Sequence, residues 1–264
     1  MIILFWVLLI IFLCFFIFFI IMSFKMKIDK KRKRWGRVIS NNLNMEKILI
    51  NDSESNPIIC HLYRSKEFVN YNKMPGVIIL PRWDKKYPFF EHWGAHFALQ
   101  GYPTLCVDIY NKKLKKTEFI EKYRKILPKI KERFCQEKQV KKNHLIYFGI
   151  DRGAEIVLLE GLPDDDVKVI CGISMHLVDE NKIKMWKNSE KVYLVHCRDD
   201  KIVNYGDFEK NMYNLGLKDG EFLVFNYGGH YLLSSEHSAA AFFSIKINQK
   251  INPKYEQIVN KKMF

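Results

Sequence analysis

An aspartate in a glycine-flanked turn is the first residue of this chain whose type and position suit covalent chemistry. Asp151 lies at the centre of Gly149-Ile-Asp-Arg-Gly153, between an apolar segment and a segment of helical character. The flanking glycines let a strand and a helix approach closely, so the middle side chain projects from a sharp turn. A carboxylate needs no base to activate it and can attack an electrophilic carbon directly, forming an ester or an anhydride. We therefore predict that Asp151 is a nucleophile.

Further along the chain, an aspartate and a histidine are of the types that such a nucleophile needs as partners. Asp200 lies in Cys197-Arg-Asp-Asp-Lys-Ile-Val203, and His230 ends the segment Asn226-Tyr-Gly-Gly-His230. A carboxylate that accepts the N–H of an imidazole fixes its tautomer and stabilises its protonated form. We predict that Asp200 plays this part, with Asp199 as the neighbouring alternative, and that His230 is the base.

Strands and helices are expected to alternate along the chain and to position these residues. Strands are predicted over 46–63 (two strands joined by a polar turn), 76–80, 104–108, 144–148, 167–173, 192–196 and 222–225, and helices over 88–100, 117–134, 154–160 and 235–249. This alternation predicts an α/β fold with a mostly parallel central sheet flanked by helices. Ligands bind beyond the carboxyl ends of such strands. The loops expected to form a site therefore follow Leu80, Phe148, His196 and Phe225.

Several segments around these loops resemble one known family. They are the apolar strand 76–80, GYPTLCVDIY (101–110), YFGIDRGAE (147–155), VYLVHCRDDKIV (192–203) and YGGHYLLSSEHSAAAFF (227–243). With the order nucleophile, acid, histidine, they make residues 46–249 similar to the dienelactone hydrolases of the α/β-hydrolase superfamily. The resemblance implies an α/β-hydrolase fold without a large cap domain, and Asp151, Asp200 and His230 as a catalytic triad.

The nucleophile position departs from the pattern of that family. Dienelactone hydrolases have Cys there, and relatives have Ser, whereas this chain has Asp151. An aspartate at this turn resembles the pattern of epoxide hydrolases and haloalkyl-type dehalogenases. Gly-Ile-Asp-Arg-Gly-Ala also resembles the D-R-G-A stretch of fluoroacetate dehalogenases, whose arginines hold the substrate carboxylate. Arg152 matches the first of those arginines, and Glu155 stands at the second.

The loop after Leu80 also departs from the family, which has a His-Gly or similar small-residue oxyanion loop there. In this chain the loop reads Pro81-Arg82-Trp83-Asp84, so Arg82 and Trp83 are candidates for contact with the substrate or its oxyanion. The backbone N–H after the nucleophile, that of Arg152, would be one oxyanion donor. The side chain of Arg152 would either bind an anionic group of the substrate or form a surface ion pair with Glu155 or a neighbour. The second oxyanion donor stays open.

Three functions are compatible with this site. The first is hydrolysis of a small ester or lactone-like substrate through a covalent intermediate on Asp151. The second is a catalytically silent scaffold that binds a ligand or partner at a membrane. The third is an epoxide hydrolase or dehalogenase on the same scaffold. No cofactor is implied, and no metal is expected, because His92 and His96 lack the intervening glutamate of H-E-x-x-H and a third ligand.

The first 24 residues predict a membrane anchor. Residues 1–24 carry no charged side chain, and about 20 apolar residues are enough to span the hydrocarbon core of a bilayer. No basic residue precedes the stretch and bulky side chains fill its far end, unlike a cleaved signal peptide. We expect a single transmembrane helix, followed by a basic juxtamembrane linker (25–45), the hydrolase-like domain (46–249) and a tail (250–264).

The net charge of +14 is concentrated in two segments. Residues 25–37 contain eight basic residues and one acidic residue, from Lys25 to Arg37. By the positive-inside rule this run places the domain on the cytoplasmic side of the membrane, and it can contact anionic headgroups. The six cysteines form no C-x-x-C pair, which is consistent with that reducing compartment.

The second basic segment, residues 112–142, contains a predicted amphipathic helix. Its thirteen basic residues are accompanied by four acidic ones, and apolar residues recur at helical spacing. A solvated helix face explains the charge, and contact with lipid is the alternative. No nucleic-acid partner is expected, because no recognition motif accompanies the charge.

Overall fold

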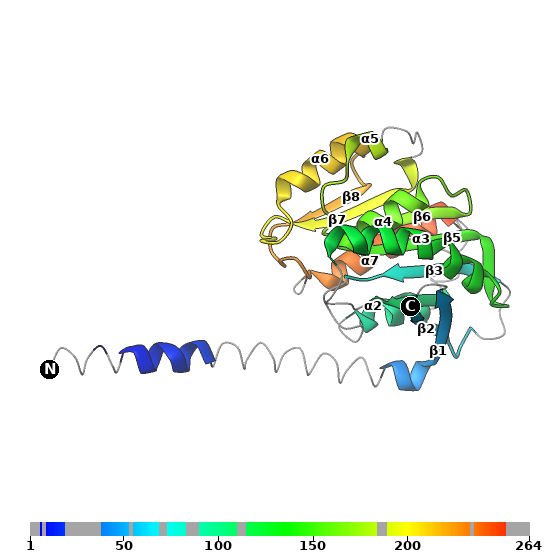
Figure 1. The fold of residues 1–264 in the computed structure, drawn as a ribbon, viewed down its shortest axis with the longest axis horizontal. Coiled ribbons are helices and arrows are strands. Elements are labelled where there is room, and N and C mark those ends of the chain that lie inside the picture. Colours follow the sequence, from blue (N-terminus) through cyan, green and yellow to red (C-terminus); the bar gives the residue numbers. More distant parts are fainter. Residues whose placement is uncertain are drawn as a thin grey trace, which may run out of the picture. The chain divides into compact units, whose positions relative to one another are not determined.

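The computed structural model describes residues 6, 9–18, 38–52, 55–68, 73–82, 90–109, 115–183, 189–232 and 235–251 (Figure 1). The chain divides into two compact units, one ending at Asn41 and the other beginning at Asn42. The second unit carries all the predicted site residues and the whole sheet. Its first strand begins at Leu43 and its last helix ends at Ile251.

The first unit contains a helical segment within the predicted anchor. Residues 9–18 are helical, and their large apolar side chains are between 36% and 70% exposed. Within the described ranges, no helix is long and apolar enough to cross a membrane. The basic run from Lys25 to Arg37 lies outside the described residues.

The sheet of the second unit has eight strands in the order β1-β2-β4-β3-β5-β6-β7-β8. The strands are β1 (Leu43–Asp52), β2 (Ser55–Ser65), β3 (Met74–Leu80), β4 (Thr104–Asp108), β5 (Val140–Ile150), β6 (Val167–Ile173), β7 (Val192–Cys197) and β8 (Phe222–Phe225). Strands β1 and β2 pair antiparallel with each other, and β2 also pairs antiparallel with β4. All other neighbours pair in parallel. The predicted α/β fold with a mostly parallel sheet is confirmed.

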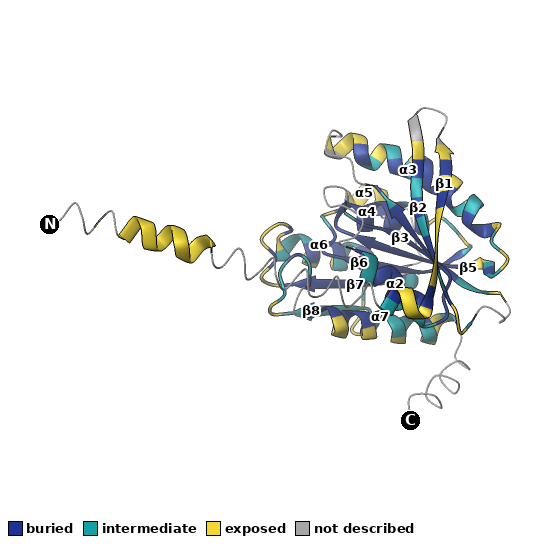
Figure 2. Ribbon diagram, turned by 90° about the horizontal axis from the view of Figure 1, so that it is seen from below, coloured by how far each residue is buried: buried dark blue, intermediate teal, exposed yellow. Residues whose placement is uncertain are grey.

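Helices cover both faces of this sheet (Figure 2). They are α2 (Glu91–Leu99), α3 (Lys116–Cys135), α4 (Arg152–Gly161), the one-turn α5 (Glu180–Ile183), α6 (Tyr205–Leu215) and α7 (Glu236–Ile251), with a 3-10 turn η2 (Ser189–Lys191). Helices α3 and α4 contact each other on one face, and α2 and α7 contact each other on the other. The stretch between β6 and β7 is too short for a helical cap domain.

An aromatic cluster packs α2 and α7 against β5. The ring of Phe148, at the carboxyl half of β5, lies 4.9 Å from Trp93 and 5.2 Å from Phe97 of α2, and 5.3 Å from Phe243 of α7. Tilted and edge-to-face pairs of this kind each add about 0.5–1.5 kcal/mol to the burial of their area. This cluster therefore fixes β5, the strand that leads into Asp151.

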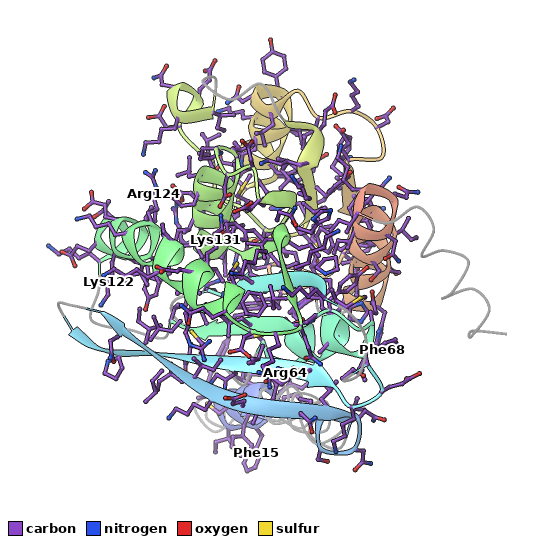
Figure 3. The ribbon with its side chains drawn as sticks, turned by 90° about the vertical axis from the view of Figure 1, so that its right-hand side faces the viewer. Phe15, Arg64, Phe68, Lys122, Arg124 and Lys131 are labelled. Carbon is purple, nitrogen blue, oxygen red and sulfur yellow. The ribbon has the colours of Figure 1, made fainter. Side chains whose placement is uncertain are left out.

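The basic helix α3 packs as its sequence pattern predicts. Its buried side is formed by Phe119, Tyr123, Ile126, Leu127, Ile130 and Phe134. At the edge of this buried side, Lys131 Nζ lies 2.8 Å from Asp164 and 2.7 Å from Asp166, and Arg124 Nε lies 2.5 Å from Glu160 (Figure 3). Part of the positive charge of this helix is thus neutralised by acidic residues of its own domain.

Helix α6 is an element that the sequence pattern did not predict. The side chain of Asn204 accepts a hydrogen bond of 2.8 Å from Gly206 N at its beginning, and Gly216 ends it with a φ of 62°. These are ordinary start and stop signals. Only Phe208 and Leu215 among its apolar residues are buried, so its apolar face is narrow and produces only a weak helical pattern in the sequence.

The glycines beside Asp151 permit the close contact between strands and helix that the sequence indicates. A Cβ on Gly153 would lie 2.0 Å from the carbonyl oxygen of Leu80, and one on Gly149 would lie 2.4 Å from the Cα of Ala154. Both clashes are with backbone atoms, which cannot move aside as a side chain can. The spacing Gly149-x-x-x-Gly153 is therefore required by the geometry of the turn.

We predict that Gly153→Ala lowers the free energy of unfolding by about 1–3 kcal/mol or more, because the added methyl overpacks the junction of β3 and α4. Gly206→Ala is the matched control, since its Cβ would meet only Asn204 Oδ1 at 3.4 Å. Urea denaturation of both variants measures the difference. Equal unfolding midpoints would contradict the close packing described for Gly153.

Candidate active site

Five strand ends on one edge of the sheet bring the candidate site together. Strands β3, β5, β6, β7 and β8 are consecutive neighbours and run parallel. The residues that follow their carboxyl ends are Arg82, Asp151, His176, Asp200 and His230, in that order. Because parallel strands end at the same edge, residues far apart in the chain meet there.

Asp151 occupies the sharp turn that the sequence predicts. Its backbone has φ 58° and ψ −118°, directly before the first residue of α4. A positive φ is unfavourable for a residue with a Cβ and persists only where the surroundings impose it. Here its N–H donates to Ile173 O at 2.9 Å, and its carbonyl accepts from Ala154 N at 3.2 Å. The residue is only 1% exposed.

His230 is held by Asp200 and faces Asp151. Its Nδ1 lies 2.8 Å from Asp200 Oδ2, and its Nε2 lies 3.9 Å from Asp151 Oδ2. The other oxygen of Asp200 accepts hydrogen bonds from the N–H groups of Ile202 at 2.8 Å and Val203 at 3.0 Å. The structure thus brings together the three residues predicted as a triad. Their catalytic roles stay a prediction.

Asp199, the alternative acid, has a different contact. Its carboxylate accepts hydrogen bonds from Gly228 N at 3.2 Å and Gly229 N at 2.8 Å, in the turn that carries His230. From the other side, the hydroxyl of Ser174 donates to the carbonyl of His230 at 3.0 Å. Asp199 therefore fixes the loop, and Asp200 fixes the imidazole.

The carboxylate of Asp151 is engaged on both oxygens. His176 Nε2, from the loop after β6, contacts Oδ1. Arg82 Nε lies 3.2 Å from Oδ2, and the guanidinium of Arg82 also lies over the ring of Tyr231, 5.6 Å from its centroid. A buried carboxylate is stable only when charges or donors compensate its desolvation, and these two residues do so.

The surroundings shift the pKa values of this set in directions that suit a nucleophile and a base. Burial raises the pKa of Asp151, but the imidazoles of His176 and His230 and the charge of Arg82 outweigh it and lower that pKa to about 2. Burial lowers the pKa of His230, but the carboxylates of Asp151 and Asp200 outweigh it and raise that pKa above 6.5. Burial raises the pKa of Asp200, and its bonds to His230 and the loop N–H groups lower it overall.

Arg152, Arg82 and Trp83, which were predicted to contact the substrate or its oxyanion, differ in where the structure places them. The Arg152 side chain pairs with Glu155, Nη1 to Oε2 at 2.5 Å, so of the two roles open for this side chain the structure shows the pairing. Both residues are buried, although the sequence suggested a surface pair. Arg82 does reach the site. Trp83 lies outside the described residues, so its predicted contact is not seen.

Other residues of reactive or metal-binding types have structural roles. His92 contacts Glu236, which ties α2 to α7. Burial, together with the nearby carboxylates of Asp199 and Asp200, raises the pKa of the Cys197 thiol to about 12. Such a thiol is not reactive. Among the residues that the structure describes, no group of three or more His, Cys, Asp or Glu side chains could hold a metal ion.

His176 is the site residue that sequence reasoning missed. It stands three residues after the end of β6, and the sequence-based prediction considered the loops after β3, β5, β7 and β8 but not this one. The rule that ligands bind at the carboxyl ends of parallel strands applies equally to β6. A titratable side chain within the first few residues after each predicted strand is therefore the signal that would have found it.

The fold is α/β-hydrolase-like, and solved structures share it. A dienelactone hydrolase-like promiscuous phosphotriesterase from metagenomic libraries has a TM-score of 0.59 and 12% identity, over 79% of this chain and 98% of that one. Thermogutta terrifontis esterase 2 has a TM-score of 0.60 and 11% identity, over 79% and 95%.

A sugar hydrolase from Lactococcus lactis has a TM-score of 0.56 and 17% identity, over 79% of this chain and 99% of that one. The search of family models found no match, and neither did the search of curated proteins. At these identities the likeness establishes the fold. It leaves the chemistry to be argued from the residues of this chain.

We predict that Asp200→Asn lowers the pKa of His230, because it removes one of the two carboxylates that raise it. A base must be neutral, so activity in the native protein rises with pH, with a midpoint above 6.5, and that midpoint falls in the variant. The rate itself drops by about 10²–10⁴-fold as the imidazole loses its orientation.

NMR titration of the His230 ring and a pH–rate profile measure these changes. Asp199→Asn is the matched control, since this neighbouring carboxylate contacts loop N–H groups and not the ring. A larger shift in the control than in Asp200→Asn would reverse the assignment of the two aspartates.

Proposed function

We propose that the chain is a hydrolase that cleaves a small ester or lactone-like substrate through a covalent intermediate on Asp151. The observation that carries this proposal is the line Asp200–His230–Asp151 at the edge of the sheet, with a hydrogen bond of 2.8 Å at one end and a gap of 3.9 Å at the other. The hydrolases that share the fold support the class of reaction.

The geometry divides the work between the two oxygens of Asp151. One oxygen attacks the substrate carbon, and the other becomes the carbonyl oxygen of the intermediate. Arg82 Nε is 3.2 Å from Oδ2, so Arg82 supplies the oxyanion donor that the sequence left open. His230 then removes a proton from a water molecule, and the resulting hydroxide attacks Cγ of Asp151 to release the product.

Two alternative functions are compatible with the same contacts. An epoxide hydrolase or a dehalogenase would use Asp151 in the same way on a different electrophile. A catalytically silent binding protein is favoured by one observation, the engagement of both carboxylate oxygens by Arg82 and His176. Isotope labelling separates a covalent hydrolase from the silent scaffold.

We predict that turnover in ¹⁸O water labels Asp151. If water attacks Cγ, repeated turnover places solvent oxygen in the carboxylate, and the tryptic peptide 143–152 gains mass. The protein is incubated with 4-nitrophenyl acetate, ethyl acetate, styrene oxide or chloroacetate, then digested and weighed. The peptide should stay unlabelled when no substrate is added.

His230→Gln provides the complementary measurement. Without the base the covalent intermediate should accumulate, so the intact mass of this variant should increase by the mass of the bound substrate fragment. Asp151→Asn should show neither adduct nor label. Turnover by the native protein that leaves peptide 143–152 unlabelled, together with no adduct in His230→Gln, would exclude a covalent intermediate on Asp151. Absence of turnover with every probe would favour the silent scaffold.

We also propose that residues 1–24 anchor the protein as a single-pass membrane helix, with the hydrolase-like domain on the cytoplasmic side. Supporting this are the absence of charge in residues 1–24, the exposed apolar side chains of the described helix 9–18, and the basic residues from Lys25 to Arg37. An anchor would hold the site close to substrates that partition into lipid.

We predict that the double substitution Phe12→Lys and Phe16→Lys releases the protein from membranes under alkaline carbonate extraction. Each lysine at the centre of a span costs about 2.5–3.5 kcal/mol of insertion free energy. Phe12→Leu with Phe16→Leu is the control and should stay in the pellet. If the native protein is itself extracted, the anchor is wrong, and protease digestion of sealed vesicles tests the orientation.

A further inference from the structure

We infer that His176 is the general acid of the reaction and that the substrate therefore loses an oxygen leaving group. This inference rests on the proposed function, and it selects esters, lactones and epoxides over halides. Its starting point is the contact of His176 Nε2 with Oδ1 of Asp151, on the oxygen that faces neither Arg82 nor His230.

The loop that carries His176 is held firmly in place. The carbonyl of His176 accepts a hydrogen bond of 2.9 Å from Asn211 Nδ2, and Asn211 Oδ1 accepts one of 3.0 Å from Val178 N. Asn211 is fully buried in α6. Ser174, at the beginning of the same loop, has a φ of 47°, and its hydroxyl donates a hydrogen bond to the His230 carbonyl. These contacts position an imidazole whose side chain is still 18% exposed.

The two oxygens of Asp151 have different neighbours. On the Oδ2 side lie Arg82 at 3.2 Å and His230 at 3.9 Å, whereas His176 lies on the Oδ1 side. If Oδ2 becomes the carbonyl oxygen beside Arg82, then Oδ1 is the attacking atom. A substrate carbon bonded to Oδ1 must have its leaving group within reach of His176.

Proton chemistry then singles out His176. The guanidinium of Arg82 does not release its proton in a protein. His230 is oriented by Asp200 to accept a proton from water, on the other side of the carboxylate. Among the described side chains that contact the Asp151 carboxylate, this leaves His176 as the group that can give a proton to the leaving atom.

The protons balance over one turnover. Oδ1 of Asp151 bonds to the substrate carbon, the bond from that carbon to the leaving oxygen breaks, and the leaving oxygen takes the proton of His176 Nε2. Water then gives a proton to His230 and adds to Cγ, and the product oxygen leaves with the proton of His230. This leaves Asp151 protonated, and it returns that proton to His176, which it contacts. Asp151 is thereby ionised again for the next turnover.

The chemistry of the leaving group follows from this step. An alkoxide is a poor leaving group unless it is protonated, whereas a halide leaves as a stable anion. A histidine placed to donate a proton is of use to the first and not to the second. The site is therefore suited to cleavage of a carbon–oxygen bond.

The test compares His176→Gln with the native full-length protein on esters of one acid. Glutamine keeps an N–H donor for Oδ1 but cannot transfer a proton. We expect hydrolysis of ethyl acetate to fall by about 10²–10⁴-fold. Hydrolysis of 4-nitrophenyl acetate should fall less than about threefold, because 4-nitrophenolate leaves without a proton. A series of substituted phenyl acetates should show a steeper dependence on leaving-group acidity in the variant.

A second histidine provides the control. His144 lies on β5, and its ring is hydrogen-bonded to the side chain of Asn143. His144→Gln should therefore leave both rates unchanged. Equal losses on both esters in His176→Gln, or no loss on either, would overturn the role as general acid. If native protein and Asp151→Asn hydrolyse the esters equally, or the native protein hydrolyses neither, the proposed function fails and the inference with it.

Discussion

The buried carboxylate of Asp151 is the feature on which the rest of the site depends. It is almost inaccessible to water, and it stays ionised because Arg82, His176 and His230 surround it. Removing a charge from water is costly unless partners replace the lost hydration. Each partner therefore has to lie within a few ångströms of it, and the loops after β3, β6 and β8 place them there.

The same requirement explains the shape of the turn around Asp151. The positive φ of 58° points its side chain above the sheet edge, and Gly149 and Gly153 leave space for the approach of β3 and α4. The aromatic cluster around Phe148 packs β5 against α2 and α7. Local strain at one residue is thus maintained by packing over a much larger area, as is usual at functional sites.

The two oxygens of the second carboxylate, Asp200, have different partners. One oxygen accepts the N–H groups of Ile202 and Val203, and the other accepts His230. Asp199 and Ser174 hold the backbone around His230, so the imidazole has little freedom. The two aspartates are adjacent in the chain, yet they stabilise different parts of the same loop.

The alternation of strands, the Gly-flanked turn at Asp151 and the residue types at 200 and 230 were readable from the sequence, because local periodicity and strand ends follow from short-range pattern. Helix α6 was missed, because its apolar face is narrow. The assignment of Asp200 over Asp199, the pairing of Arg152 with Glu155, and the approach of Arg82 and His176 to Asp151 were decided by the tertiary structure. Such contacts depend on strand order and on the direction of each side chain, which no single segment of sequence determines.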